Sequence, residues 1–321
     1  MHIRSKRHLD VRRTVWISLF LIAATPLGLL VPMESTSTAA DAETPAQLRI
    51  AAGRIRPLHR IKMPSGPEDW LATHREAGQT FEQYRHSNPN RPTKERTILY
   101  VQPIGAFTNA ERQLVDETAD LLSRFYNVRT KVLDPIGLDV IPSKAQRVHP
   151  TSGDRQILTT YVLDKVLKPR RPRNAVAMLA LTTADLWPGE GWNFVFGQAS
   201  LSERVGVWSL FRFGNAEGPK AESRQFRRRT FKVAVHETGH MLGIAHCTAY
   251  ECGMNGANHL AEMDSRPFYF CPECVQKIWW ACHADPIQRY ESLIEFARRH
   301  GLDAEAEFWQ KSVDRLRHPA G

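Results

Sequence analysis

The pattern of apolar and polar positions in the middle of the chain predicts a sheet backed by helices. Residues 97–101 and 128–133 are rich in β-branched and apolar side chains, as strands are, and Ala175–Thr182 is a continuous apolar run typical of a buried central strand. The stretches between them, 108–125 and 154–167, are predicted helices, and the first carries its apolar side chains near one helical face. The order strand, helix, strand, helix, strand predicts an α/β (α+β) domain with a mixed sheet.

The two ends of the chain follow other patterns. Residues 285–321 contain two stretches with apolar side chains at helical spacing, separated by Gly301, and are expected to form a C-terminal helical hairpin. Residues 43–95 are mostly polar, with a short helical stretch around Trp70, and form an expected extension that covers the central domain or regulates its cleft. This leaves residues 96–284 as the central domain.

Residues 1–42 resemble a bacterial-type signal peptide. Five basic residues precede an apolar run from Val15 to Val31, and the small residues of STSTAADA follow. We expect cleavage between about Ala39 and Thr44 and export to the periplasm or the extracellular space. Because the apolar run reaches the lower limit for spanning a bilayer, an uncleaved membrane anchor is the alternative.

Composition and charge place the rest of the chain among ordinary globular proteins. The 321 residues are 42% apolar and 24% charged, with a net charge of +9. Part of this excess is local, at Lys168–Asn174 and Arg224–Lys232, which we interpret as solvated basic turns. Binding of nucleic acid or an anionic surface is the alternative, but the segments lack the interleaved aromatic platform that such binding uses, so no specific nucleic-acid partner is expected.

The stretch HETGHMLGIAH has the spacing of a catalytic zinc site. His236 and His240 are four residues apart, so one face of a helix presents both imidazoles to one metal ion. Gly243 can adopt the left-handed conformation that ends a helix, which lets His246 return as a third ligand. Glu237 lies beside the first ligand, where a general base would reach a zinc-bound water.

Four cysteines follow the third histidine, interleaved with Met254. Their positions suit a closed tetrahedral zinc site, and disulfide bridges are the alternative in an exported protein. The set comprises Cys247, Cys252, Cys271 and Cys274.

Together, the long zinc motif, the methionine and the four cysteines resemble the archaemetzincin family. Weaker similarity extends from about Gly66, through GQTFEQY and ILYVQPIG, to the C-terminal tail. The resemblance implies a metzincin-like catalytic domain over residues 96–284 and two zinc ions, one catalytic on the three histidines and one structural on the four cysteines. It also implies that Glu237 is the base and that Met254 is the methionine of the Met-turn beneath the metal.

One further segment is a candidate for substrate binding. In metzincins an antiparallel edge strand above the metal pairs with extended substrate, and residues 196–200 are the candidate by position. An internal hairpin whose edge is already paired is the alternative. The candidate residues are Phe196, Gly197, Gln198, Ala199 and Ser200.

These features predict a zinc-dependent peptidase with peptide or protein substrates. Two other classes are considered: a non-catalytic binding module stabilised by both metals, and a Cys₄ element that binds nucleic acid through the basic segments. Glu237 argues against the first, because a structural site has no evident use for a carboxylate that is not a ligand. Predicted export argues against the second.

Overall fold

The computed structural model describes residues 44–318, so the predicted leader and its cleavage site lie outside the described residues. Five strands form the main sheet in the order β2-β1-β5-β8-β7. They are β1 (Ile98–Ile104), β2 (Thr130–Val132), β5 (Ala175–Thr182), β7 (Gly197–Ala199) and β8 (Val205–Ser209). The first four in this order are parallel, and β7 is antiparallel to β8 at the edge. The predicted mixed sheet is confirmed.

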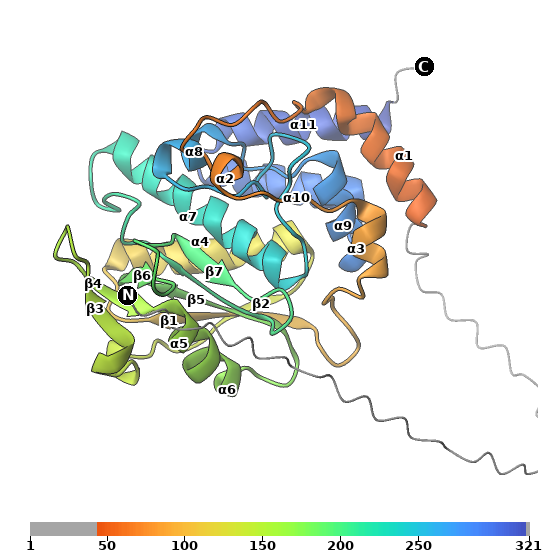
Figure 1. The fold of residues 1–321 in the computed structure, drawn as a ribbon. Helices are drawn as coiled ribbons and strands as arrows, with labels where there is room; N and C mark the ends of the chain where they lie inside the picture. The colour runs from red at the N-terminus through yellow and green to blue at the C-terminus, as the bar shows by residue number, and fades with distance from the viewer. Residues whose placement is uncertain (1–43, 319–321) are drawn as a thin grey trace, which may run out of the picture. The chain divides into compact units, whose positions relative to one another are not determined.

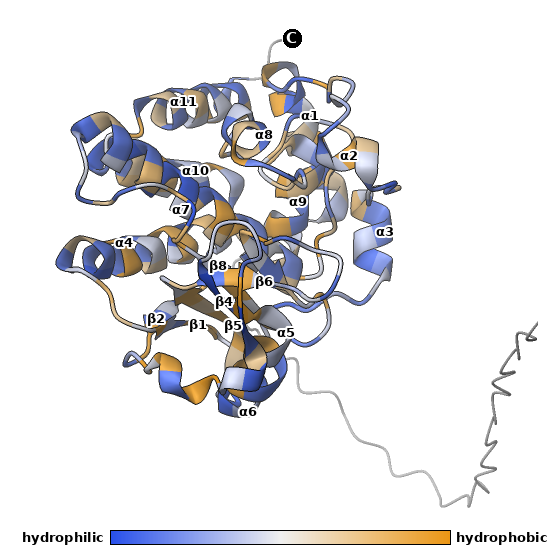
Figure 2. Ribbon diagram, turned by 60° about the vertical axis from the view of Figure 1, so that its left-hand side comes forward, coloured by the Kyte–Doolittle hydropathy of each residue, from blue (hydrophilic) through white to orange (hydrophobic). Residues whose placement is uncertain are grey.

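The central strand β5 is buried along its whole length, and its alternate side chains enter two different hydrophobic clusters. Leu179 lies in the cluster on one face of the sheet, whereas Met178 lies in the cluster on the other. Both faces are therefore covered, which explains why the sequence of this strand is a continuous apolar run. Figure 2 shows hydrophobic residues along the central strands and on the inward side of the helices.

Helices α4 (Asn109–Tyr126) and α7 (Lys220–Met241) cover one face of the sheet, as Figure 1 shows. The first begins at a capping box in which the side chains of Thr108 and Glu111 satisfy each other's backbone amides. The other face packs against a continuous helical stretch made of three short pieces. These are α5 (Thr159–Tyr161), a π-helical turn η4 (Val162–Leu167) and α6 (Lys168–Arg170).

The prediction of one helix from 154 to 167 is wrong at its beginning. Residues 155–158 form strand β4 (Arg155–Leu158) of a second, three-stranded sheet, with β3 (Gln146–Val148) and β6 (Asp185–Trp187) on either side. Pairing with β6, almost thirty residues away, outweighs the local preference of this stretch.

The extension and the C-terminal helices pack together. Helix α1 contacts α9 and α11, α3 contacts α9, and α10 contacts both α11 and α4. These contacts make the extension part of the same folded unit as the sheet. The helices are α1 (Pro45–Ile55), α2 (Trp70–Thr73), α3 (Phe81–His86), α8 (Leu260–Ser265), α9 (Pro272–Ala281), α10 (Pro286–Arg299) and α11 (Asp303–Arg317), with 3-10 turns η1 (Arg56–Leu58), η2 (Leu138–Val140) and η3 (Ser143–Ala145).

Helix α7 begins at Lys220, and the segment Arg224–Lys232, expected as a solvated basic turn, is its middle. Three consecutive arginines there form ion pairs with three other elements: Arg227 with Glu117 of α4, Arg228 with Glu305 of α11 and Arg229 with Asp264 of α8. Lys232 is buried. These ion pairs connect α7 to its neighbouring helices, so the charges of the three arginines are paired within the fold. Within residues 44–318 no helix has the length and apolar character needed to cross a bilayer.

Candidate active site

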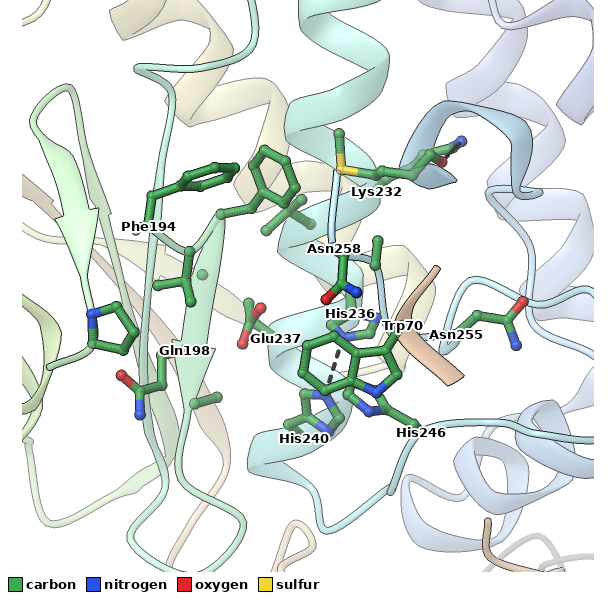
Figure 3. A pocket seen from close by; sticks show the side chains of 18 of the residues that line it. Trp70, Phe194, Gln198, Lys232, His236, Glu237, His240, His246, Asn255 and Asn258 are labelled. Carbon is green, nitrogen blue, oxygen red and sulfur yellow. Dashed lines mark hydrogen bonds between the residues drawn. The ribbon is translucent and has the colours of Figure 1, made fainter. Parts of the chain in front are cut away.

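The last two turns of α7 bring His236 and His240 together on one face. Their Nε2 atoms are 3.0 Å apart, and the rings are nearly perpendicular. The helix ends at Met241, and Gly243 adopts a left-handed conformation with φ of 84°, as predicted from its lack of a Cβ. The chain then turns back and places the His246 ring 4.8 Å from that of His240. The three histidines converge as Figure 3 shows.

Hydrogen bonds fix the tautomer of all three rings. Nδ1 of His236 donates to the carbonyl of Gly253 (2.9 Å), and Nδ1 of His240 donates to the carbonyl of Ile244 (2.7 Å). Nδ1 of His246 donates to the carboxylate of Glu76 (2.9 Å). Each Nε2 therefore keeps its lone pair. Two such lone pairs 3.0 Å apart have no proton to share, and a zinc ion between them, at about 2 Å from each, fits this arrangement.

Electrostatics also favour neutral imidazoles at this point. Burial lowers the pKa of His236 well below its ordinary value, and the neighbouring His240 and His246 lower it further. Burial and His246 lower the pKa of His240 to about 3. Because zinc binds the neutral imidazole, both residues are in the protonation state of a ligand across the physiological range.

Glu237 lies beside the three histidines but is not one of the proposed metal ligands. Its side chain is buried, and its Oε2 atom has no hydrogen-bond partner among the described residues. Burial raises the pKa of this carboxyl to about 8. A buried carboxylate without a partner is costly, and such groups concentrate where chemistry uses them. Figure 3 shows the carboxylate between the edge strand and the histidines.

Met254 lies directly beneath the histidine helix. It is fully buried, and a Cβ added to Gly239 would lie 2.6 Å from its Sδ atom. Only glycine at this position lets the methionine approach the helix so closely. The resemblance noted above implies that this residue is the methionine of a Met-turn.

The four cysteines gather in one buried cluster behind the third histidine, with all thiols within 4.8 Å of one another. The Sγ atoms of Cys247 and Cys271 are 3.6 Å apart, close to the ~3.8 Å expected for two thiolates on one tetrahedral zinc. Cys252 Sγ accepts hydrogen bonds from the amides of Met254 and Cys271. The four are free thiols in this arrangement, which fits the predicted metal site. Cys282, also buried, is not part of this cluster.

A cavity of about 620 Å³ opens over the histidines and Glu237. Aromatic side chains form much of its wall, whereas Lys232, Asn255 and Asn258, labelled in Figure 3, are among its polar lining residues. Arg266 also lines it. The aromatic residues are Trp70, Trp192, Phe194 and Phe196.

The candidate substrate-binding segment lies along one side of this cavity. Residues 197–199 form β7, which within residues 44–318 pairs with β8 alone and leaves its other side at the edge of the sheet. Inside the hairpin, the backbone amide of Ser200 donates to the carbonyl of Val205, and the carbonyl of Phe196 accepts from the amide of Ser209. By the alternation of an antiparallel pair, the backbone groups of residues 197 and 199 face the open edge. Internal pairing of both edges, the alternative, does not occur among the described strands.

Two residues of this site were not found from the sequence. Trp70 stands edge-on to His246 with ring centroids 5.1 Å apart, and it stacks on His74, which in turn stacks with Trp192. Glu76 binds the third histidine, as described above. Both come from the N-terminal extension, and the sequence contains no motif that links them to histidines about 170 residues away.

Comparisons with known proteins show which family the sequence resembles. The model of Peptidase family M54 matches residues 164–279. Archaemetzincin-2 of Pongo abelii is 33% identical over 262 residues, covering 72% of each chain, and archaemetzincin-2 of Homo sapiens is 32% identical over the same share. Among solved structures, the archaemetzincin of Archaeoglobus fulgidus, complexed with malonate, is 31% identical and covers 56% of this chain and 99% of its own, with a TM-score of 0.45. The archaemetzincin of Methanopyrus kandleri is 27% identical, covering 59% and 97%, with a TM-score of 0.48.

Three histidines, a buried glutamate and an open cleft beside an edge strand define a zinc metallopeptidase. The sequence identity and coverage make the family definite. The chain belongs to the archaemetzincins.

Proposed function

We propose that this protein hydrolyses peptide bonds with Glu237 as the general base, and that it carries two zinc ions, one on the three histidines and one on the four cysteines. The observation that carries the first part is the buried Oε2 of Glu237, which has no partner among the described residues and faces the cleft. When bound to three imidazoles, zinc lowers the pKa of a water to about 7 and polarises a carbonyl oxygen.

The side chain of Glu237 then has two proton transfers to perform. Its carboxylate accepts a proton from the water that attacks the peptide carbonyl and donates this proton to the leaving amine. Because Gly197 lies against this carboxylate, strand β7 positions the base and the substrate backbone together.

The open edge of β7 supports binding of an extended peptide. The outward-facing backbone groups of residues 197 and 199 would pair with the substrate main chain, as an added strand pairs with a sheet. The cavity lies on the other side of this peptide and would take one of its side chains. Peptides and proteins are therefore the proposed substrates, with no specific nucleic acid.

Glu237→Gln tests the role of the base, because it keeps the size of the side chain but removes its basicity. The variant should retain the metal content and thermal stability of the parent and lose at least about a hundredfold in turnover of a peptide-library substrate. His240→Ala should instead lose one metal ion per chain. Cleavage by the glutamine variant at the parent rate, with its metal verified, would refute the mechanism. If the parent cleaves no peptide in the library, a non-catalytic binding module takes the place of the enzyme.

We also propose export through the leader, with membrane anchoring as the alternative. N-terminal sequencing of the protein made in its own host tests this: a start between about Ala39 and Thr44 in the soluble exported fraction supports cleavage. Recovery of the intact apolar run in membranes would replace export with anchoring.

A further inference from the structure

The three zinc-binding histidines differ in what holds their rings. The Nδ1 atoms of His236 and His240 donate to backbone carbonyls within seventeen residues of each ligand, whereas Nδ1 of His246 donates to a side chain from the distant extension. His246 also lies outside the helix, after the turn at Gly243, so α7 does not fix its backbone. Of the three ligands, it depends most on an outside contact for its orientation.

That contact is a charged one. Both oxygens of Glu76 lie near Nδ1 of His246, at 2.9 and 3.0 Å, and the side chain of Glu76 is only 29% exposed. A carboxylate is a stronger acceptor for Nδ1–H than a carbonyl oxygen and makes Nε2 a more basic ligand.

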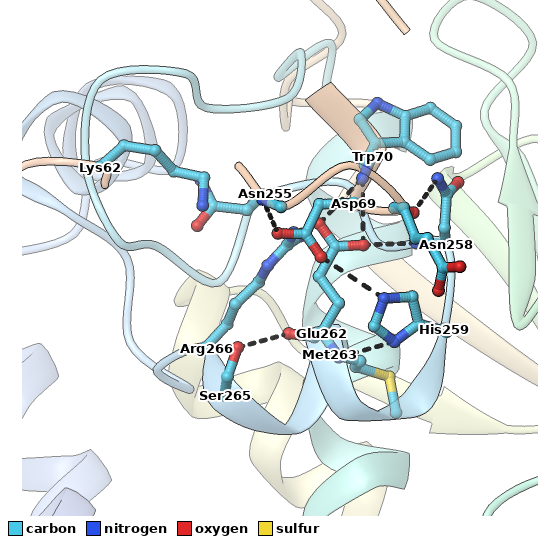
Figure 4. Close-up of polar contacts among 12 residues, drawn as sticks. Lys62, Asp69, Trp70, Asn255, Asn258, His259, Glu262, Met263, Ser265 and Arg266 are labelled. Atoms are coloured by element: carbon cyan, nitrogen blue, oxygen red, sulfur yellow. Dashed lines mark hydrogen bonds and ion pairs between the residues drawn. The ribbon is translucent and has the colours of Figure 1, made fainter. Parts of the chain in front are cut away.

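The segment that carries Glu76 is held on both of its sides. We call residues 66–80 the strap. Before Glu76, the amide of Trp70 donates to the buried carboxylate of Glu262 (3.0 Å), as Figure 4 shows. After it, Gln79 accepts from the amide of Ala245 and donates to the carbonyl of Gly243, both at 3.2 Å. Gln79 thus binds the backbone of the turn that leads to His246, the third ligand.

The anchor at Glu262 has the residue types of a metal site but does not have free ligand atoms. Asp69, His259 and Glu262 lie together. However, the Glu262 carboxylate accepts from the amides of Trp70 and Asn258 and pairs with Arg266. Nδ1 of His259 accepts from the amide of Glu262, and its Nε2 faces Asp69 (Figure 4). The polar atoms of this cluster are used in hydrogen bonds and ion pairs with one another and with the strap. The cluster therefore attaches the strap to α8 and is not a metal site.

We propose that the strap completes the catalytic metal site and that Glu76 is the positioning residue of His246. The proposal rests on the three histidines holding a metal ion, as proposed above. Glu76 orients the imidazole through Nδ1 and raises the basicity of Nε2, and it touches neither the substrate nor the metal. The N-terminal extension is then a part of the metal site and not only a cover over the cleft.

The test measures metal affinity in the full chain, with zinc kept on the cysteines. Competition with a chelator gives the dissociation constant of zinc at the histidines for the parent and the variants. Glu76→Gln keeps a neutral acceptor and should weaken binding by about tenfold, and Glu76→Ala should approach about a hundredfold, the usual range for such outer contacts. Glu68→Gln is the matched control, because Glu68 is an exposed glutamate of the same strap whose side chain makes no hydrogen bond or ion pair with the described residues.

A spectroscopic measurement separates positioning from a general loss of stability. With cobalt(II) on the histidines and zinc on the cysteines, the visible absorption of the cobalt reports its ligand geometry. The spectrum should change in Glu76→Gln and match the parent in Glu68→Gln, while the melting temperatures of the metal-free proteins stay the same. Parent-like affinity and spectrum in Glu76→Gln would overturn the positioning role alone. A parent that binds neither zinc nor cobalt at the histidines would overturn the metal site as well.

Discussion

Gly197 of the edge strand lies against the carboxylate of Glu237, so closely that a Cβ on this glycine would be 2.6 Å from Oε1 and 2.8 Å from Cδ. The strand that would align the substrate and the side chain that would move the proton are therefore in direct contact. The φ of Gly197 is not positive, so its backbone conformation does not require glycine. Glycine is required because a side chain would collide with the carboxylate.

Gly197→Ala should displace the glutamate while leaving the ligands in place. A shift of the base by about 1 Å is expected to lower kcat by ten- to a hundredfold. Metal analysis and thermal melting should match the parent, because neither ligand set includes the strand. A variant with the parent's kcat would show that the carboxylate has room to move without loss of function.

The contact between Gly239 and Met254 predicts an effect on stability. In Gly239→Ala the new methyl group meets the methionine sulfur, and overpacking of this kind costs about 1–3 kcal/mol. Gly53→Ala is the control: nothing lies within 4 Å of its added Cβ in helix α1, so it should stabilise the protein by about 0.5–1 kcal/mol. Urea unfolding at a fixed zinc concentration measures both. Equal effects of the two substitutions would contradict the close packing beneath the metal helix.

His59 predicts a pH dependence of stability. Its ring is buried edge-on against Tyr269 and Phe308, and neither ring nitrogen has a hydrogen-bond partner among residues 44–318. Burial lowers the pKa of His59 from 6.5 to about 4, with a small opposing effect of Cys247. Between these two pH values the unfolded chain binds more protons than the folded chain, so this group makes stability fall as the pH falls.

The measurement compares the parent with His59→Phe at pH 7 and pH 5. The parent should lose about 2 kcal/mol more of its unfolding free energy than the variant over this interval. Loss of metal at low pH affects both proteins equally and cancels in the difference. His86→Phe on the exposed side of α3 should follow the parent's profile. If the unfolding free energies of the parent and His59→Phe change equally between pH 7 and pH 5, burial does not lower the pKa of His59 in the folded protein.

Metal content gives a prediction for both ligand sets. Elemental analysis of the purified chain should find two zinc ions, and His240→Ala should retain one of them, because the cysteine cluster does not include the histidines. A thiol reagent added after denaturation in a chelator should then react with all five cysteines. A single zinc ion, with thiols that react only after reduction, would establish disulfides in place of the second site.

The parts of the site that the sequence predicts are those determined by local spacing. His236, Glu237 and His240 share one helix, Gly243 ends it, and His246 follows within a few residues, so helical geometry alone brings them together. The cysteines lie within one short stretch of the chain and were found in the same way.

The contributions that depend on distant pairing could not be predicted. Glu76 and Trp70 reach the site because the strap folds back over a turn about 170 residues later, which no local pattern encodes. The strand at residues 155–158 was mistaken for helix because its pairing with β6 is also non-local. The segment Arg224–Lys232 was expected as a solvated basic turn, but it lies within helix α7, where ion pairs with other elements stabilise its arginines.

The third histidine and the first cysteine, His246 and Cys247, are consecutive residues. The backbone amide of Cys247 also donates to the carbonyl of Met254 beneath the helix (2.8 Å). Under the proposed assignment, one peptide bond thus joins a hydrolytic centre to a cluster of oxidisable sulfurs. Under the same assignment, oxidation of these thiolates would free the segment that carries the third histidine and stop hydrolysis, although no sulfur takes part in the reaction. The redox conditions around such an enzyme would then set how long it stays active, through residues that never meet the substrate.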